Sequence, residues 1–434
     1  MICISTAGTA DPAPFRRAAE LGLAPDGGLY MPAHIPALDK TLLDGEKEPT
    51  LQEIAVAVTS FFTADTPAHA SLDEWVREAI HFEAPLVRLR DDLYILELFH
   101  GPTLAFKDFG ARFMSRYFRA SGLLEGEPLT ILAATSGDTG SAVANGFYRM
   151  NGVEVCLLFP KGKVSDVQRK QMTTLGHNVT ALEVDGTFDD CQKLVKQAFN
   201  DTSLRAKKRL SSANSINLAR LVPQTFYYLH AAVQLHRQTG HSPVFSVPSG
   251  NFGNLTAGLL AERMGMAVER FIAATNCNSV VPEFLNGSGF EPRPSVQTIS
   301  NAMDVGNPSN FDRMMHLFRG DADAMRKHLF GASFSDDETR LAIRRTYREN
   351  GYIADPHTAV GLLAVEAARE KKITDAPAIV LATAHPAKFR ETVEASMEAS
   401  VPIPERLKAA LRKPEKSLPM AADYPALRDY LLDS

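Results

Sequence analysis

The chain has 434 residues, which is enough for about three domains of ordinary size and for a large hydrophobic core. Lys and Arg total 46 and Asp and Glu total 51, and the net charge of −5 argues against a broad surface for nucleic acid or acidic membranes. The four cysteines are scattered and form no C-x-x-C pair, which argues against a disulfide scaffold and a zinc site. The sequence has no signal-peptide pattern and no apolar run of about 18 residues. We therefore expect a cytoplasmic protein that has no metal site and binds neither nucleic acid nor a membrane.

The first 84 residues are rich in proline and carry two helical patterns, at 51–62 and 72–80, which predict a separate N-terminal unit. Beyond this unit, short apolar runs alternate with amphipathic segments, which predicts an α/β fold with parallel sheets covered by helices on both faces. The predicted strands are 93–98, 129–134, 153–159, 179–184, 244–247, 271–274 and 378–382. Residues 276–355 break the alternation, and we interpret them as an insertion or as one wall of the ligand cleft. Ligands bind at the carboxyl ends of parallel strands, so the loops after these runs are the candidate sites.

The loop 133–141 follows one predicted strand and begins a helix. Its two glycines let a ligand approach the backbone, and the hydroxyls of Ser136 and Thr139 with the helix amides can hold a carboxylate or phosphate. Asp138 adds a negative charge that does not suit a phosphate loop. A plain helix cap with turn glycines is the alternative, and the sequence leaves both interpretations open.

A second loop, 247–254, also lies between a predicted strand and a predicted helix. Gly250 and Gly253 permit backbone conformations in which successive N–H groups converge on an anion. The loop lacks the Lys-Ser/Thr ending of a Walker A motif and is not a G-x-G-x-x-G motif. It therefore predicts a phosphate cradle without a magnesium ligand.

A third segment, 97–109, contains Lys107 among apolar residues, with Phe106 and Phe109 on either side. A lysine removed from water has a lowered pKa and can act as a neutral nucleophile for Schiff-base chemistry. The alternative is a lysine that extends to solvent or pairs with Asp108, which is common for a lone lysine. An apolar lysine together with a phosphate cradle suggests pyridoxal phosphate as the cofactor.

In this order and spacing, the segments 97–109, 133–143 and 247–258 resemble the threonine synthases, a family of fold-type II pyridoxal-phosphate enzymes. The segments 214–217 and 298–310 extend the resemblance, which covers most of the chain. The second of these, with the long N-terminal unit, is similar to the branch of the family found in many bacteria and fungi.

The resemblance implies roles for individual residues. It implies that Lys107 forms the Schiff base with the cofactor and that Thr383 contacts the pyridine nitrogen. It also implies that the cofactor phosphate is held by Gly250, Asn251, Phe252, Gly253 and Asn254. It implies that the amino-acid substrate is bound by Thr103, Ser136, Gly137, Asp138, Thr139 and Asn214. A neutral hydroxyl does not keep the ring nitrogen protonated, which suits elimination and replacement better than transamination. The Thr383 hydroxyl could instead satisfy a loop amide, and we expect the nearby His385, which precedes a proline, to be a turn residue.

The resemblance also implies the domain organisation. We expect an N-terminal domain at 1–84, a large cofactor-binding domain at 85–110 and 214–400 with an insertion at about 276–355, a small α/β domain at 111–213, and a C-terminal tail at 401–434.

The activity that the resemblance implies is conversion of O-phospho-L-homoserine and water to L-threonine and phosphate, by γ-elimination and β-hydration. The alternatives are a threonine dehydratase-like lyase or an O-phosphohomoserine phospholyase of the same fold, and a non-catalytic relative that only binds ligands. Asp138, where dehydratases and cysteine synthases usually carry Asn, favours threonine synthase, and Lys107 counts against a non-catalytic protein. Because this branch is often monomeric, we expect a monomer with a small-molecule substrate as its partner.

The substrate's own phosphate needs a second anion site. Ser165 and Gln168 have the spacing of a capping box, so a helix is expected to begin directly after Ser165 and to end near residue 175. Lys161 and Lys163 therefore lie beside a helix N-terminus, where the helix dipole disfavours cations. Either they are solvated, or they bind an anion together with Ser165 or Arg169; in the second case Lys163, nearer the cap, is the preferred ligand of the γ-phosphate.

Overall fold

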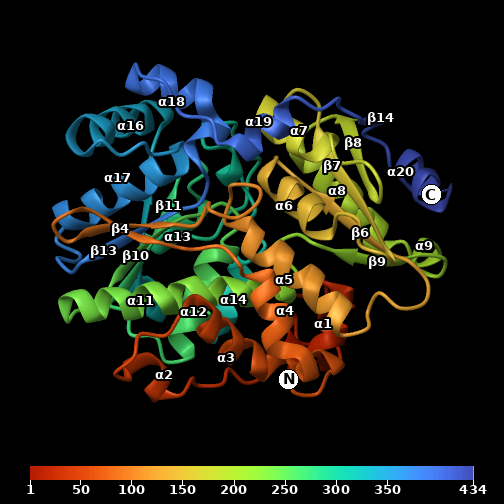
Figure 1. Ribbon diagram of the computed structural model, residues 1–434, viewed down its shortest axis with the longest axis horizontal. Coiled ribbons are helices and arrows are strands. Elements are labelled where there is room, and N and C mark those ends of the chain that lie inside the picture. Colours follow the sequence, from red (N-terminus) through yellow and green to blue (C-terminus); the bar gives the residue numbers. More distant parts are fainter. Residues whose placement is uncertain (434) are drawn as a thin grey trace.

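The structure, a computed structural model, describes residues 1–433 of the chain, and in this range it forms three sheets. Figure 1 shows the two larger sheets side by side, with the N-terminal unit below both of them. Within residues 1–433, no helix combines the length and the apolar character that crossing a membrane would require.

The N-terminal unit is a small antiparallel sheet covered by helices. Its elements are β1 (Ile2–Ser5), β2 (Ala13–Pro14), α1 (Phe15–Leu21), β3 (Tyr30–Pro32), α2 (Lys40–Asp44), α3 (Leu51–Thr63), η1 (Pro67–Ser71) and α4 (Leu72–Ala79). Thr50 and Glu53 form a capping box that starts α3, as the helical pattern predicted. Trp75 of α4 packs on Phe113 with ring centroids 5.2 Å apart, which joins the unit to the helix that follows Lys107.

The first large sheet has six strands in the order β12-β11-β10-β13-β5-β4. Its strands are β4 (Leu86–Arg90), β5 (Leu93–Glu97), β10 (Val244–Pro248), β11 (Arg270–Thr275), β12 (Leu329–Ser333) and β13 (Ala378–Ala382). All pairings are parallel except that of β4 with β5 at the edge. The second large sheet has the order β14-β8-β7-β6-β9 and is parallel throughout. Its strands are β6 (Leu129–Ala134), β7 (Val153–Pro160), β8 (Val179–Asp185), β9 (Arg209–Ser212) and β14 (Leu418–Ala421).

Helices cover these sheets. They are α5 (Lys107–Ala120), α6 (Asp138–Phe147), α7 (Asp166–Thr173), α8 (Phe188–Asn200), α9 (Thr202–Arg205), α10 (Leu218–Leu221), η2 (Val222–Gln224), α11 (Thr225–Thr239), α12 (Gly253–Arg263), α13 (Val280–Leu285), η3 (Asn301–Met303), α14 (Phe311–Leu317), α15 (Ala322–His328), α16 (Asp336–Asn350), α17 (Pro356–Glu370), η4 (Pro386–Phe389), α18 (Arg390–Met397), α19 (Glu405–Leu411) and α20 (Tyr424–Asp433). Every residue of β6, β10 and β13 is buried, as expected for strands covered on both faces. The α/β fold with parallel sheets is confirmed, and all seven predicted strands form within one residue of their expected ends.

Two segments carry more structure than the sequence indicated. Residues 276–355, interpreted as an insertion or wall, also supply β12 at the edge of the six-stranded sheet. Residues 401–434, expected to be a tail, add β14 in parallel to β8, and in Figure 1 β14 and α20 lie on the outer side of the second sheet. Both are edge strands, and neither has the continuous apolar run of a central strand. β14 contains Pro419, which is tolerated at the edge of a sheet.

Candidate active site

The carboxyl ends of strands from both large sheets meet at one cavity. The residues that line it come from the segments after β5, β6, β8, β9, β10 and β13, together with the loop 301–305 and His357. Among the residues named from the sequence, the cavity is lined by Lys107, Ser136, Thr139, Asn214, Gly250, Asn251, Phe252, Gly253, Asn254 and Thr383. Fold topology thus brings together three loops that are far apart in the sequence, at the position where parallel sheets bind ligands.

Lys107 is the first residue of α5 and lines this cavity. Removal from water lowers its pKa to about 8, and the Asp138 charge opposes that shift, while Lys388 and Arg220 add to it. Its Nζ lies 5.6 Å from the centre of the Phe106 ring. Asp108, the alternative partner considered from the sequence, accepts instead from the Thr103 backbone N–H and hydroxyl, at 2.8 and 2.7 Å. A lysine with a lowered pKa at the wall of a cavity has the properties that a nucleophile or base requires.

The loop after β10 packs tightly against the 301–305 wall and leads into a helix N-terminus. A Cβ on Gly250 would lie 2.7 Å from the Ala302 oxygen and 2.7 Å from the Met303 Cα, so only glycine fits there. Phe252 has φ +58° and starts α12, whose first N–H groups have no acceptor within the helix. The Asn254 Oδ1 accepts from two buried tyrosine hydroxyls, which leaves its Nδ2 buried without a partner.

The loop after β6 surrounds the start of α6. Thr135 Oγ1 accepts from the N–H groups of Gly137 and Gly140, at 2.9 and 2.8 Å. Gly137 has φ +130°, and a Cβ there would lie 2.4 Å from the Gln168 side chain. Ser136 and Thr139 line the cavity, whereas the buried carboxylate of Asp138 points to Gln168 and Lys388. This loop is both a helix start and part of the cavity wall, so the two interpretations of the sequence are compatible.

After β13, Thr383 is 6% exposed and lines the cavity. Its backbone oxygen accepts from the Phe106 N–H at 2.9 Å, which fixes the approach to Lys107. His385 caps η4 by accepting from the Ala387 N–H at 3.1 Å, in agreement with the expected turn role. Burial lowers the pKa of His385 to about 4, so the ring is neutral at physiological pH.

Six residues expected to contact the substrate do not line this cavity: Gly137 and Asp138, described above, and Thr103, Lys163, Ser165 and Arg169. Thr103 is engaged by Asp108, and Ser165 caps α7 in the predicted capping box, with its hydroxyl also donating to the Lys388 oxygen. Lys163 is exposed, and Arg169 is paired with Asp166 and Glu415. The helix α7 begins where expected but ends at Thr173, two residues early. The roles proposed for these residues toward a substrate stay predictions.

Other polar residues of the cavity were not identified from the sequence. Arg220 lines the cavity, is 3% exposed, and has a buried Nε without a partner. His357 lies opposite and accepts from the Ala302 N–H at 3.2 Å, while its Nδ1 is 2.6 Å from the Asp355 carboxylate. Arg220 lies three residues after the segment 214–217 named above, and a lone arginine in an apolar helix is the signal that could have revealed it.

The wall formed by 301–305 also carries Asp304. Burial raises the pKa of this carboxyl to about 6, although Thr298 and Asn276 donate hydrogen bonds to it. The backbone of this wall sits against Gly250, so the phosphate cradle and the wall form one packed unit.

The residues present fit pyridoxal phosphate. The cavity offers one lysine with a lowered pKa, a glycine loop at a helix N-terminus, and the side chains of Asn254 and Arg220, whose amide and guanidinium groups suit anionic oxygens. Within the described residues, the 250–254 loop contains no basic side chain, so its amides and the α12 dipole would supply the charge compensation for a phosphate.

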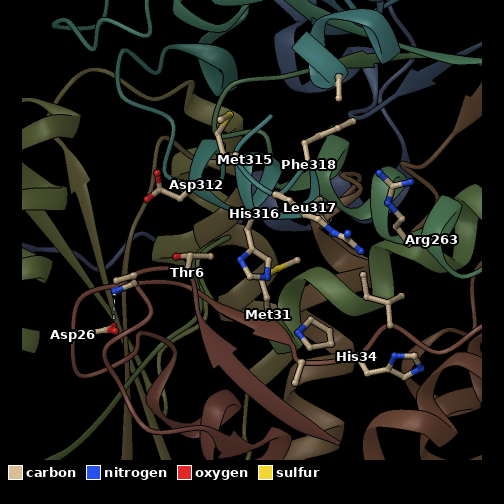
Figure 2. Close-up of a pocket in the computed structure, with 18 of the residues that line it drawn as sticks. Thr6, Asp26, Met31, His34, Arg263, Asp312, Met315, His316, Leu317 and Phe318 are labelled. Atoms are coloured by element: carbon tan, nitrogen blue, oxygen red, sulfur yellow. Dashed lines mark hydrogen bonds between the residues drawn. The ribbon is translucent and has the colours of Figure 1, made fainter. Parts of the chain in front are cut away.

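A larger hollow of about 1370 Å³ lies elsewhere, between the N-terminal unit and α14. Figure 2 shows it, with His316 and Met31 at its centre and His34 and Arg263 along one side. Asp26 at its margin is engaged by the Gly28 N–H and by the hydroxyls of Ser5 and Thr9. None of the described residues that line this hollow is a lysine, so we assign the Schiff-base chemistry to the smaller cavity.

Comparison with protein families supports this assignment. The family described as pyridoxal-phosphate dependent enzyme matches residues 79–384, the threonine synthase N terminus matches 3–80, and the threonine synthase C-terminal family matches 358–431. The chain is 43% identical over 418 residues to a threonine synthase of Serratia marcescens and 43% identical over 419 residues to one of Escherichia coli K12, with 96% of each chain covered in both cases.

Solved structures agree. The chain is similar to a crystal structure of threonine synthase from Escherichia coli, with a TM-score of 0.92, 42% identity and 100% of both chains covered. It is also similar to a pyridoxal-phosphate-bound threonine synthase from Brucella melitensis, with a TM-score of 0.92, 37% identity, and 100% of this chain and 99% of that chain covered.

Proposed function

Since the chain belongs to the threonine synthase family of pyridoxal-phosphate-dependent enzymes, we propose that it converts O-phospho-L-homoserine and water to L-threonine and phosphate. The observation that carries the proposal is the position of Lys107, in the cavity that the Gly250–Asn254 loop also lines. A dehydratase or phospholyase with the same fold would share these two features. Similarity to threonine synthases from residue 3 to residue 431 favours the proposed reaction over both alternatives.

Bound pyridoxal phosphate stabilises negative charge on the substrate carbons during the reaction. In the proposal, Lys107 would hold the cofactor and would act as the base that takes the proton from the substrate Cα. Because its pKa is lowered to about 8, part of the Lys107 population is neutral near pH 8 and able to accept this proton. When pyridoxal phosphate is bound, the 250–254 loop would hold its phosphate and Thr383 would interact with its pyridine nitrogen.

The substrate has two anionic ends, and the cavity has two further places for them. We assign its carboxylate to the start of α6, where Ser136 and Thr139 face the cavity. We assign its phosphate to Arg220, because among the described residues that line the cavity it is the only Lys or Arg besides Lys107. Negative charge grows on the leaving phosphate as the Cγ–O bond breaks, so a buried cation there assists the elimination as well as binding. This places Arg220 ahead of Lys163, which is exposed.

We further infer that the enzyme acts in the cytoplasm as a monomer on this small molecule. The four cysteines are all free thiols, which suits a reducing compartment. Size-exclusion chromatography with light scattering tests the monomer, and a mass near twice 47.4 kDa would contradict it.

The activity is tested by incubating the purified protein with pyridoxal phosphate and O-phospho-L-homoserine and identifying the products. The expected result is equal amounts of L-threonine and phosphate. Formation of 2-oxobutanoate in place of threonine would support the dehydratase-like or phospholyase alternatives, and no reaction would support a ligand-binding role.

A further inference from the structure

The loop proposed to hold the substrate carboxylate carries a negative charge of its own. Asp138 is the first residue of α6 and its side chain is 3% exposed. The helix N-terminus attracts anions, but an uncompensated carboxylate at this position would repel a second one. The structure must therefore offset this charge if Ser136 and Thr139 are to bind a carboxylate.

The offset is Lys388, which lies 250 residues further along the chain. Its Nζ is 2.8 Å from Asp138 Oδ1, and Lys388 is 1% exposed. Gln168 Nε2 donates to the same Oδ1 at 2.9 Å, so the carboxylate is held by one charged and one neutral donor. No role in the reaction described above falls to Lys388.

Lys388 also links three segments that surround the cavity. Its Nζ donates to the Thr103 oxygen at 2.9 Å, in the loop that leads to Lys107. Its own carbonyl accepts from the Ser165 hydroxyl at 3.2 Å, at the start of α7. The buried ammonium group of Lys388 in η4 therefore connects the loop before Lys107 with the α6 loop. The Lys388 backbone is hydrogen-bonded to the start of α7.

We propose that Lys388 is a positioning residue that neutralises Asp138 and so keeps the Ser136–Thr139 loop receptive to the carboxylate of the amino-acid substrate. This inference rests on the proposed function. It also explains how the loop can carry Asp138 beside a site for an anion. The carboxylate is paired with the Lys388 ammonium group, and this buried pair fixes the loop relative to Lys107.

The charges around Asp138 give the proposal a pH signature. Burial raises the pKa of Asp138, but the charges of Lys388 and Lys107 outweigh burial and hold it well below its usual range. Asp108 and Arg220 complete the charged groups near these lysines. Without Lys388 the pKa of Asp138 rises, so the carboxylate would be charged and repulsive at high pH and protonated and neutral at lower pH.

The experiment compares Lys388→Met, Asp138→Asn and the double variant in the holoenzyme, with Lys196→Met on the exposed face of α8 as the control. At about pH 8, Lys388→Met is expected to raise the KM for O-phosphohomoserine about tenfold or more, because one partner of a buried pair is left charged. Lowering the pH should reduce this defect, because the fraction of Asp138 that is protonated and neutral grows as the pH falls. The double variant, with neither charge, should recover the KM to within about threefold of the wild type.

A second measurement does not depend on turnover. L-Threonine binding is followed by the absorbance of the bound cofactor, and its Kd should show the same pattern across the variants and pH values. If the wild type makes no threonine, the proposed function fails, while this titration still tests Lys388. If Lys388→Met does not fold, as judged by its thermal unfolding, the double variant alone decides by its KM and Kd.

Two results would overturn the proposal. One is an unchanged KM and Kd in Lys388→Met at pH 8. The other is a double variant as defective as Lys388→Met at every pH, which would mean that the lysine acts by a contact of its own and not through Asp138.

Discussion

Lys107 has two roles in the proposed reaction, as the nucleophile that holds the cofactor and as the base. Lys107→Ala should lower kcat by at least about a thousandfold, because the variant lacks both the nucleophile and the base. Borohydride reduction of the wild-type holoenzyme followed by peptide mapping should place the pyridoxyl group on Lys107. The matched control is Lys196→Ala, an exposed lysine of α8, which should keep wild-type activity. A pyridoxyl group on another lysine would contradict the assignment.

Arg220 and Lys163 are rival cations for the substrate phosphate, and their surroundings differ. Arg220 is buried at the cavity wall, whereas Lys163 is exposed beyond the capping box of α7. Arg220→Met should raise the KM for O-phosphohomoserine about tenfold or more, and Lys163→Ala should change it by less than about twofold. Steady-state kinetics with inhibition by free phosphate measure both. The reverse order of effects would restore Lys163 as the phosphate ligand.

Among the elements, the turn from β10 into α12 has the least tolerance for change. Gly250→Val should weaken cofactor affinity about a hundredfold or more, because its Cβ would meet the Ala302 and Met303 backbone at 2.7 Å. Equilibrium titration with pyridoxal phosphate measures the loss. Gly289→Val in an exposed loop is the control, since the nearest atom to a Cβ there, on the Glu291 side chain, is 3.7 Å away. Equal affinities in the two variants would exclude the loop as the cradle.

The central strands were predictable because their physical signal is local. A strand buried on both faces, such as β6 or β13, reads as a continuous apolar run, and the functional loops follow directly from parallel topology. The edge strands β12 and β14 lack that signal, since each has residues that are not buried, and one contains a glycine and the other a proline. Their positions depend on tertiary pairing, which the sequence pattern does not report.

At the scale of the whole molecule, the C-terminal segment belongs to the second sheet. Leu427 of α20 is 0% exposed and packs in the cluster that contains Leu182 and Val184 of β8. Leu427→Ala should lower the free energy of unfolding by about 2–5 kcal/mol, as for other buried leucines. Leu418→Ala, at a position 48% exposed, should cost less than about 0.5 kcal/mol. Denaturant unfolding measures both, and equal costs would contradict the packing of α20.

The site was less predictable than the fold for a related reason. Lys107, the 250–254 loop and Thr383 each follow a predicted strand, so topology alone brings them together. Lys388 and Arg220 carry no such marker, because the partners that define them come from distant segments: Asp138 for Lys388, and the cavity itself for Arg220. Charge pairing across about 250 positions is a property of the folded chain and has no periodicity to detect.

The most direct test of the proposed reaction is to run it in ¹⁸O-labelled water and to examine both products by mass spectrometry. Elimination breaks the Cγ–O bond, so phosphate leaves with its own four oxygens, and the hydroxyl later added at Cβ comes from water. We predict L-threonine carrying one ¹⁸O atom and phosphate carrying none. Unlabelled homoserine with labelled phosphate would show hydrolysis at phosphorus instead, and would contradict the assignment of this chain as a working threonine synthase.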